Sequence, residues 1–148
     1  TAKTEMLLYA AARAQHVEEK VLPALQAGKV VLSDRYVDSS IAYQAYGRGL
    51  GDMVAQVNAI ATGGLVPDLT VFLDLPPAVG MARKQQEENH ELDRLEQEKL
   101  EFHQKVYEGY DALCKKEAER ICRIDASGTI EEVFGQIKEA LDQLLDRA

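Results

Sequence analysis

Apolar positions repeat at helical spacing over the first part of the chain, and the pattern predicts a long helix from Ala2 to about Ala27. Pro23 is expected to kink or restart this helix, and Gly28 is expected to end it. The stripe that should face inward recurs every three or four residues. Its members are Leu7, Ala10, Ala14, Val17, Val21 and Leu25.

The same spacing predicts three helices further along the chain. They cover residues 52–61, residues 92–116 and the C-terminal stretch, where Thr129 and Glu132 have capping-box spacing at the start of the helix. A fourth helix is expected to begin at Pro76-Pro77, because proline suits a first helical turn. The inward-facing residues of the first of these helices are expected to be Val54, Val57 and Ile60.

Three short segments are expected to form strands, Lys29–Ser33, Ile121–Asp125 and Leu69–Leu75, the last of which is a nearly continuous apolar run. Such runs are typical of strands covered on both faces. Because they alternate with the helices, the expected fold class is α/β, a parallel sheet with helices on both faces. Residues 1–148 have the size of a single domain and show no internal repeat.

Composition narrows the class of protein. With 46% apolar and 28% charged residues the chain is an ordinary globular sequence, and its net charge of −8 argues against non-specific nucleic-acid or anionic-membrane binding. No apolar run approaches the ~20 residues that span a bilayer, so we expect a cytoplasmic protein without a membrane partner. Cys114 and Cys122 have neither the number nor the spacing of a metal site or a disulfide framework.

Candidate chemistry gathers directly after the first predicted strand, in the run VLSDRYVDSSIAYQ that ends at Gln44. Ligands of open α/β sheets bind beyond the carboxyl ends of parallel strands. Asp34 is suited to a magnesium ion, Arg35 to a phosphate and Gln44 to the edge of a base. The alternative is that Asp34 and Arg35 make only surface contacts, and residues 52–75 suggest no chemistry.

This run resembles the signature of the thymidylate kinases, the enzymes that transfer the γ-phosphate of ATP to thymidine 5′-monophosphate. The matching residues are Asp34-Arg35-Tyr36, Ser39-Ser40 and Ala42-Tyr43-Gln44. The upstream run TEMLLYAAAR and the downstream run LDRLE are similar to the same family. The resemblance covers essentially all 148 residues and implies a fold of the P-loop nucleotide kinase type, with ATP and Mg²⁺ as cosubstrate and cofactor.

The resemblance implies a role for several residues. Tyr9 would stack on thymine and Arg13 would donate to a base carbonyl, although a core aromatic and a solvated arginine explain the two residues by themselves. Ser40 would lie near the base methyl, and Gln44 would bind the base nitrogen and carbonyl. Arg48 would lie near the nucleotide, unless it is a surface arginine.

On the phosphate side, the resemblance implies that Arg35 clamps the acceptor phosphate and that Asp34 acts through the magnesium shell. Residues 83–94 would form the lid over the phosphates, with Arg94, and in addition Arg83, neutralising the transferring phosphoryl group. His90 stands where another arginine is expected, and we interpret it as an exposed histidine. The cofactor-binding residues beside the adenine of ATP would be Ala126 and Ser127, which a plain strand-to-helix turn explains equally well.

The P-loop run G-x-x-x-x-G-K-[ST], which holds the donor phosphates, does not occur in these 148 residues. The resemblance places it, with the N-terminal strands, before Thr1, so we expect the chain to be part of a longer polypeptide and inactive without that segment. The expected enzyme is a thymidylate kinase that acts as a homodimer. The alternatives are a kinase of another nucleoside or nucleotide and a non-catalytic nucleotide-binding fragment.

Overall fold

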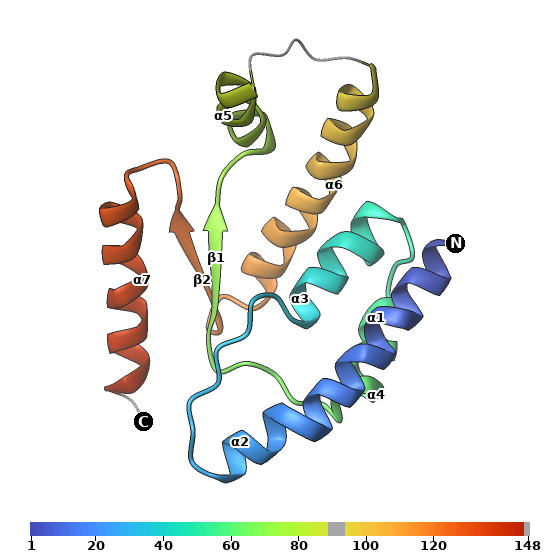
Figure 1. The fold of residues 1–148 in the computed structure, drawn as a ribbon, viewed down its shortest axis with the longest axis vertical. Helices are drawn as coiled ribbons and strands as arrows, with labels where there is room; N and C mark the ends of the chain where they lie inside the picture. The colour runs from blue at the N-terminus through green and yellow to red at the C-terminus, as the bar shows by residue number, and fades with distance from the viewer. Residues whose placement is uncertain (89–93, 147–148) are drawn as a thin grey trace. The chain divides into compact units, whose positions relative to one another are not determined.

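The computed structural model describes the backbone of residues 1–88 and 94–146, and the side chains of residues 1–83 and 99–146. The chain forms two compact units, Thr1–Val66 and Pro67–Ala148, which are described one after the other (Figure 1). Among the described helices, none combines the length and the apolar character needed to cross a membrane.

The first unit begins with the expected long helical segment, in three parts: α1 (Ala2–His16), η1 (Val17–Val21) and α2 (Leu22–Gln26). The middle part is a π-helical turn, in which the Leu22 N–H donates to the carbonyl five residues back. This turn lies directly before Pro23, whose ring cannot continue a regular helix. Gly28 ends the segment with a left-handed φ of 71°, as expected.

The buried stripe of this segment differs from the expected one at both ends. Met6, Ala10, Val17 and Val21 are buried, whereas Leu7 and Leu25 are 49% and 39% exposed. The inward face toward α4 (Met53–Thr62), against which α1 packs, begins one position earlier than the leucine spacing suggests. Apolar spacing gives the period of a helix, but the neighbouring helix decides which residues become buried.

The rest of the first unit is also helical. It consists of α3 (Val37–Ser40), a second π-helical segment η2 (Ile41–Gly47), and α4, which ends at Gly63 in a left-handed conformation. On α4 the buried residues are Val54, Asn58 and Thr62, and the expected inward residue Ile60 is 83% exposed. That expectation is wrong because the buried face of α4 carries polar residues, which a pattern of apolar positions does not reveal.

The strand expected at Lys29–Ser33 is not formed, and this prediction is wrong. The segment has no regular secondary structure, and its apolar residues Val30 and Leu32 are 81% and 86% exposed. A strand is stabilised by the ladder and the side chains of its neighbours rather than by its own residues. None of the residues that the structure describes pairs with this segment, so its apolar composition is not sufficient.

The second unit contains the other two expected strands, β1 (Thr70–Asp74) and β2 (Ile121–Asp125), which pair in parallel from Thr70 with Ile121 to Asp74 with Asp125. The connection between them holds α5 (Pro77–Glu88) and α6 (Arg94–Lys116), and α7 (Ile130–Leu145) follows β2. These helices confirm the predicted order.

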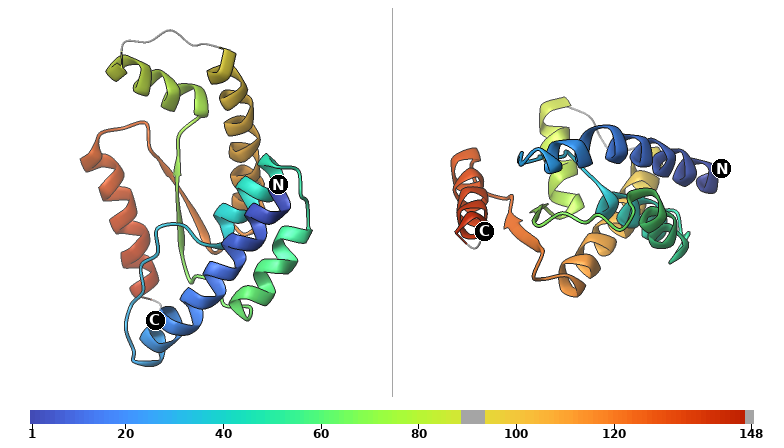
Figure 2. Two further views of the ribbon diagram at one scale, coloured as in Figure 1. Left: turned by 45° about the vertical axis from the view of Figure 1, so that its right-hand side comes forward. Right: turned by 90° about the horizontal axis from the view of Figure 1, so that it is seen from below.

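Helices cover both faces of the two strands (Figures 1 and 2). The Arg123 side chain on β2 points to α6, where it pairs with Asp111 at 2.5 Å. On the other side Gln136 of α7 accepts from the Asp125 N–H at 3.1 Å. The α/β fold class, with a parallel sheet and helices on both faces, is therefore confirmed.

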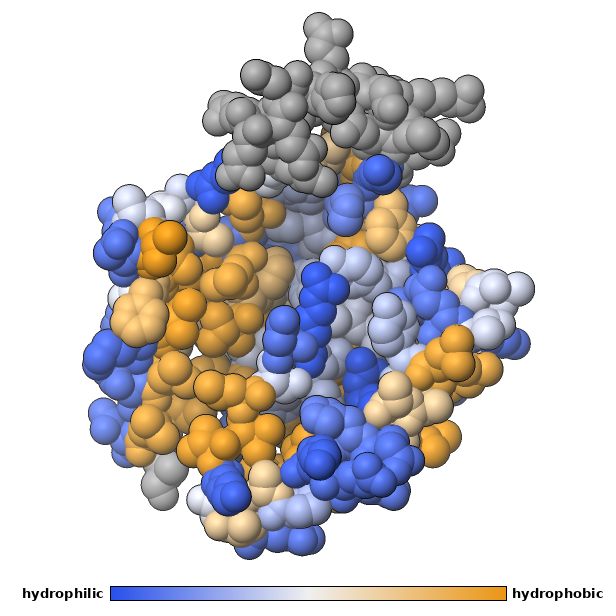
Figure 3. Space-filling model, in the orientation of Figure 1, coloured by the Kyte–Doolittle hydropathy of each residue, from blue (hydrophilic) through white to orange (hydrophobic). Residues whose placement is uncertain are grey.

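The expected capping box opens α7. Thr129 Oγ1 accepts from the Glu132 N–H at 3.2 Å, and the Glu132 carboxylate accepts from the Thr129 N–H at 2.7 Å. Apolar side chains gather on the surface around α7 and the strands (Figure 3). The most exposed large apolar residues of the second unit are Leu73, Ile130, Phe134 and Leu145.

Candidate functional site

Arg13 is held by polar contacts inside the first unit. Its guanidinium donates to the side-chain oxygen of Asn58 on α4 and to the Tyr36 carbonyl at 3.1 Å, and it lies 5.6 Å from the centre of the Tyr36 ring. Partial burial lowers the pKa of Arg13 from its usual value, but an arginine remains charged at neutral pH. The solvated arginine that the sequence allowed is therefore ruled out.

Gln44 is buried and is held by a side chain of α1. It is 4% exposed, and its amide Nε2 donates to Glu5 Oε1 on α1 at 2.9 Å. Arg48, at the end of η2, pairs with the other carboxylate oxygen of Glu5 at 3.4 Å. The hydrogen bond from Gln44, with a further contribution from Arg48, lowers the pKa of Glu5 below its usual range.

These contacts show that α1 runs antiparallel to the segment formed by α3 and η2. Arg13 lies beside Tyr36 at the start of α3, and Glu5 lies beside Gln44 on η2. Residues 5, 9 and 13 follow each other along one face of α1, about 6 Å apart. We call this arrangement the α1–η2 seam, and it consists of Glu5, Tyr9, Arg13, Tyr36, Ser40, Gln44 and Arg48.

Within the seam, Tyr9 lies midway between the two contacts on α1, and Ser40 lies midway on the opposite segment. Tyr9 is 55% exposed, whereas Ser40 is 4% exposed. Tyr9 is therefore not the core aromatic that the sequence left open. The seam therefore combines buried polar groups with an exposed aromatic ring, and such groups suit the binding of a flat heterocycle. The π-helical segment η2 fits this interpretation, because π-helical turns are frequent at functional sites.

Asp34 and Arg35 lie in an exposed bend just before α3. Arg35 has a φ of 68°, in the left-handed region that a residue with a Cβ seldom adopts, at a cost of about 1–3 kcal/mol. The Ser33 hydroxyl donates to the Arg35 carbonyl at 2.9 Å, and the Arg35 guanidinium lies 5.2 Å from the Tyr43 ring centre. This bend places Arg35 next to η2, the segment that carries Gln44.

In the second unit, polar groups gather at the carboxyl ends of both strands. A cavity of about 590 Å³ opens there. Asp74, which ends β1, accepts from the Tyr107 hydroxyl at 2.9 Å and pairs with Arg123 at 3.4 Å. The hydrogen bond to Asp74 raises the pKa of Tyr107. The cavity is lined by Asp74, Leu75, Pro76, Val79, Arg123, Asp125, Ser127 and Gln136.

The loop at Ala126-Ser127 borders this cavity and is tied to α5. Arg83 donates to the Ala126 carbonyl at 3.2 Å and to the Ser127 carbonyl at 2.7 Å. Asp125 accepts from the Ser127 N–H at 2.9 Å, and hydrogen bonding by Ser127 lowers the pKa of Asp125. Arg83 therefore stabilises the loop predicted to lie beside adenine.

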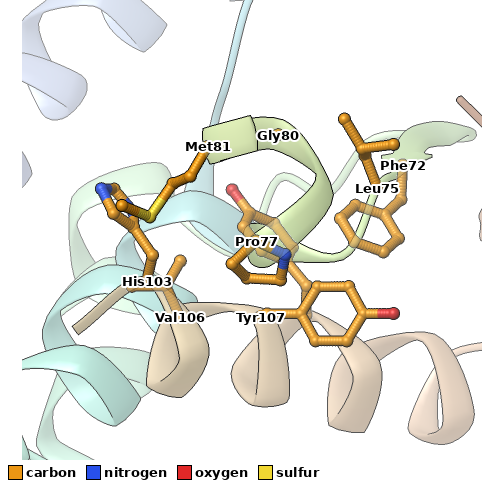
Figure 4. Close-up of a pocket in the computed structure, with 9 residues that line it drawn as sticks. Phe72, Leu75, Pro77, Gly80, Met81, His103, Val106 and Tyr107 are labelled. Atoms are coloured by element: carbon orange, nitrogen blue, oxygen red, sulfur yellow. The ribbon is translucent and has the colours of Figure 1, made fainter. Parts of the chain in front are cut away.

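The described side chains include one of the arginines predicted for the lid. Arg83 is described, but the Arg94 side chain and the whole of His90 lie outside the described residues. A second cavity, of about 340 Å³, lies between β1, α5 and α6 and contains no predicted site residue (Figure 4). Met81 and His103 line one end of it in that view, and Phe72 and Leu75 line the other. It is mostly apolar and suggests no chemistry.

Sequence reasoning missed three residues of the seam and its support. Glu5 was detectable, because its spacing places it on the face of Tyr9 and Arg13. Tyr36 contributes a backbone carbonyl, which no side-chain pattern reveals. Asn58, 1% exposed, lies in the stretch from which no chemistry was expected, yet it binds Arg13. The described residues include no group of three or more metal-binding side chains.

Comparison with known proteins identifies the family. The sequence matches the family model described as Thymidylate kinase over residues 1–137. The chain belongs to the thymidylate kinase family. Its fold is therefore of the P-loop nucleotide kinase type.

Several thymidylate kinases are similar along most of the chain. That of Latilactobacillus sakei subsp. sakei is 54% identical over 95% of this chain and 66% of its own length. That of Lactobacillus delbrueckii subsp. bulgaricus is 57% identical over 89% and 63%, respectively. A Geobacillus sp. thymidylate kinase is 48% identical over 98% of this chain and 70% of its own length. The chain thus spans just under two thirds of the first two relatives.

Proposed function

We propose that this chain is the acceptor-binding part of an enzyme that phosphorylates thymidine 5′-monophosphate with ATP, giving the diphosphate. The observation that carries the proposal is Gln44, a buried amide whose Oε1 receives no hydrogen bond from any described residue. A buried acceptor without a partner is costly unless a ligand supplies the donor. The N3–H of thymine is such a donor.

The other seam residues take roles around that contact. The Arg13 guanidinium keeps further N–H groups after its two observed contacts and donates to a carbonyl of the base. Tyr9 stacks on the ring, and Ser40 lies near the methyl group. Arg48, held by Glu5, contributes positive charge near the nucleotide. A site built to bind N–H and carbonyl groups rejects bases that lack them.

Phosphate chemistry is assigned to the bend before α3. An acceptor phosphate oxygen attacks the γ-phosphorus of ATP, the bond to the β-phosphate oxygen breaks, and ADP leaves. Arg35 binds the acceptor phosphate through its planar fork and orients it for in-line attack. Arg94 neutralises the transferring group, an assignment that follows from family membership alone.

A magnesium ion bound to a nucleotide keeps several waters and takes only one or two carboxylates. The single exposed carboxylate of Asp34 fits that donor set. Asp34 would hold the ion through water, and the ion would supply charge neutralisation at the phosphates. On the donor side, the Ala126-Ser127 loop, held by Arg83, packs against adenine. We also propose that the enzyme is a cytoplasmic homodimer, as the family resemblance implies.

The test uses the complete protein with ATP, Mg²⁺ and thymidine monophosphate, and measures the diphosphate formed. Gln44→Leu should weaken thymidine monophosphate binding by about 1–3 kcal/mol, because it removes the acceptor for the base. Gln56→Leu, at an exposed glutamine of α4, is the control and should bind normally. The proposal would be contradicted if the Gln44 variant bound thymidine monophosphate with unchanged affinity. It would also be contradicted if the enzyme phosphorylated a nucleotide with another base in preference to thymidine monophosphate.

A further inference from the structure

Glu5 controls the orientation of the Gln44 amide. The two ends of a glutamine side chain have nearly the same shape but opposite hydrogen-bonding character, since the NH₂ donates and the oxygen accepts. An ionised carboxylate only accepts, so the group that faces Glu5 Oε1 at 2.9 Å must be Nε2. The other end, Oε1, is thereby left for a ligand.

Three observations support this orientation of the Gln44 amide. The hydrogen bond from Gln44 and the ion pair with Arg48 lower the pKa of Glu5, so the carboxylate is ionised at neutral pH. Arg48 also occupies the second carboxylate oxygen at 3.4 Å, which limits rotation of the carboxylate. Gln44 itself is 4% exposed, so its amide is oriented by the neighbouring protein groups and not by water.

We infer that Glu5 is a positioning and specificity-determining residue, which fixes the Gln44 amide so that the seam accepts an N–H from the base. This inference rests on the proposed function, because it takes the seam as the base site. Thymine presents an N3–H to such an acceptor. Cytosine presents an unprotonated N3 at the same place, which opposes Gln44 Oε1 and would be satisfied only by a reversed amide.

The contact differs from an ordinary surface hydrogen bond between glutamine and glutamate. Gln15 and Glu19 form such a bond one turn apart, with both side chains exposed. Glu5 and Gln44 are 39 residues apart, and Gln44, unlike Gln15, is buried. Glu19→Gln is therefore a matched control, because it changes the same pair of groups where no base is proposed to bind.

The experiment measures the affinities of thymidine monophosphate and deoxycytidine monophosphate by calorimetry, on the complete protein and its Glu5→Gln, Glu5→Ala, Glu19→Gln and Gln44→Leu variants. In Glu5→Gln the new amide accepts or donates, so Gln44 adopts both orientations. The ratio of the two affinities should fall about tenfold, because one oriented hydrogen bond is worth about that factor. Part of the fall should appear as tighter deoxycytidine monophosphate binding, which a structural defect does not produce.

The outcomes separate the inference from the function on which it rests. A fall of more than about threefold in both Glu5 variants, with Glu19→Gln unchanged, supports the inference. A smaller fall, or an equal loss of both affinities, overturns it and assigns Glu5 a structural role only, provided that Gln44→Leu still weakens thymidine monophosphate. If Gln44→Leu leaves that affinity unchanged, the base site itself has been misplaced, and the inference fails with it.

Discussion

The two units bury different kinds of residue. All buried polar residues that the structure describes belong to the first unit: Asp38, Ser40, Gln44, Asn58 and Thr62. The buried residues described in the second unit are apolar, among them Val106, Leu113, Ile121 and Ile124. Burying polar groups is costly unless they are bound, so the first unit trades stability for positioned donors and acceptors. The second unit has a conventional apolar core, and its polar contacts lie around the two ends of its strands.

The difference teaches where to look for function in this chain. An apolar interior tolerates volume-conserving exchange and is sensitive mainly to cavities. A polar interior depends on the identity and orientation of each group, because an unpaired donor or acceptor loses its full hydration. Changes in the second unit should therefore alter folding, and changes in the seam should alter recognition.

The largest effect is expected in the second unit. Ile124 is 3% exposed on β2, and Ile124→Ala should lower the free energy of unfolding by about 2–5 kcal/mol through lost burial and a cavity. Denaturant unfolding measures this, and thymidine monophosphate affinity of the folded protein should not change. Ile130→Ala, at a residue 84% exposed, is the control and should leave stability nearly unchanged. If Ile124→Ala weakened thymidine monophosphate binding by more than its lower fraction of folded protein explains, the contrast between the two units would be contradicted.

An intermediate effect is expected at Arg35. Arg35→Lys keeps the charge but loses the planar fork, so turnover or acceptor affinity should fall roughly tenfold to a hundredfold, or about 1.4–2.8 kcal/mol. Unfolding should change little, because Arg35 is exposed. Binding of thymidine, which has no phosphate, serves as the control. If thymidine and its monophosphate respond equally, Arg35 has a structural role and the bend does not bind phosphate.

The smallest effect concerns a partly exposed ion-pair group in the second unit. Asp111 pairs with Lys115 at 2.6 Å and with Arg123 at 2.5 Å, and these hydrogen bonds lower its pKa. A group with a lowered folded pKa stabilises the protein above its unfolded pKa, and that contribution is lost as pH falls through the folded value. Between neutral pH and about pH 4, Asp111→Asn should therefore be slightly less stable than the parent, and the difference should vanish at lower pH. A difference that persists in acid would mean that packing, not charge, is responsible.

The outcome of sequence reasoning in the seam shows the limit of motif recognition. Tyr9, Arg13, Ser40 and Gln44 were selected by family resemblance, and the structure brings them to one seam. Their roles remain proposals. Glu5 and Asn58 were not selected, although each holds one of them. A motif describes the residues proposed to contact the ligand, and not the residues that hold them in place. Glu5 lies 39 residues from Gln44, and Asn58 lies 45 residues from Arg13.

The sequence by itself determined the local features of this protein. The capping box at Thr129 and Glu132 and the left-handed stop at Gly28 were readable, because contacts within about four residues decide them. The strands β1 and β2 were also predicted, although their pairing depends on each other. Only the tertiary structure decided that Lys29–Ser33 is not a strand and that Ile60 is exposed. It also decided which end of Gln44 is left for a ligand. The physical reason is common to all three: burial, sheet pairing and side-chain orientation depend on neighbours distant in the sequence.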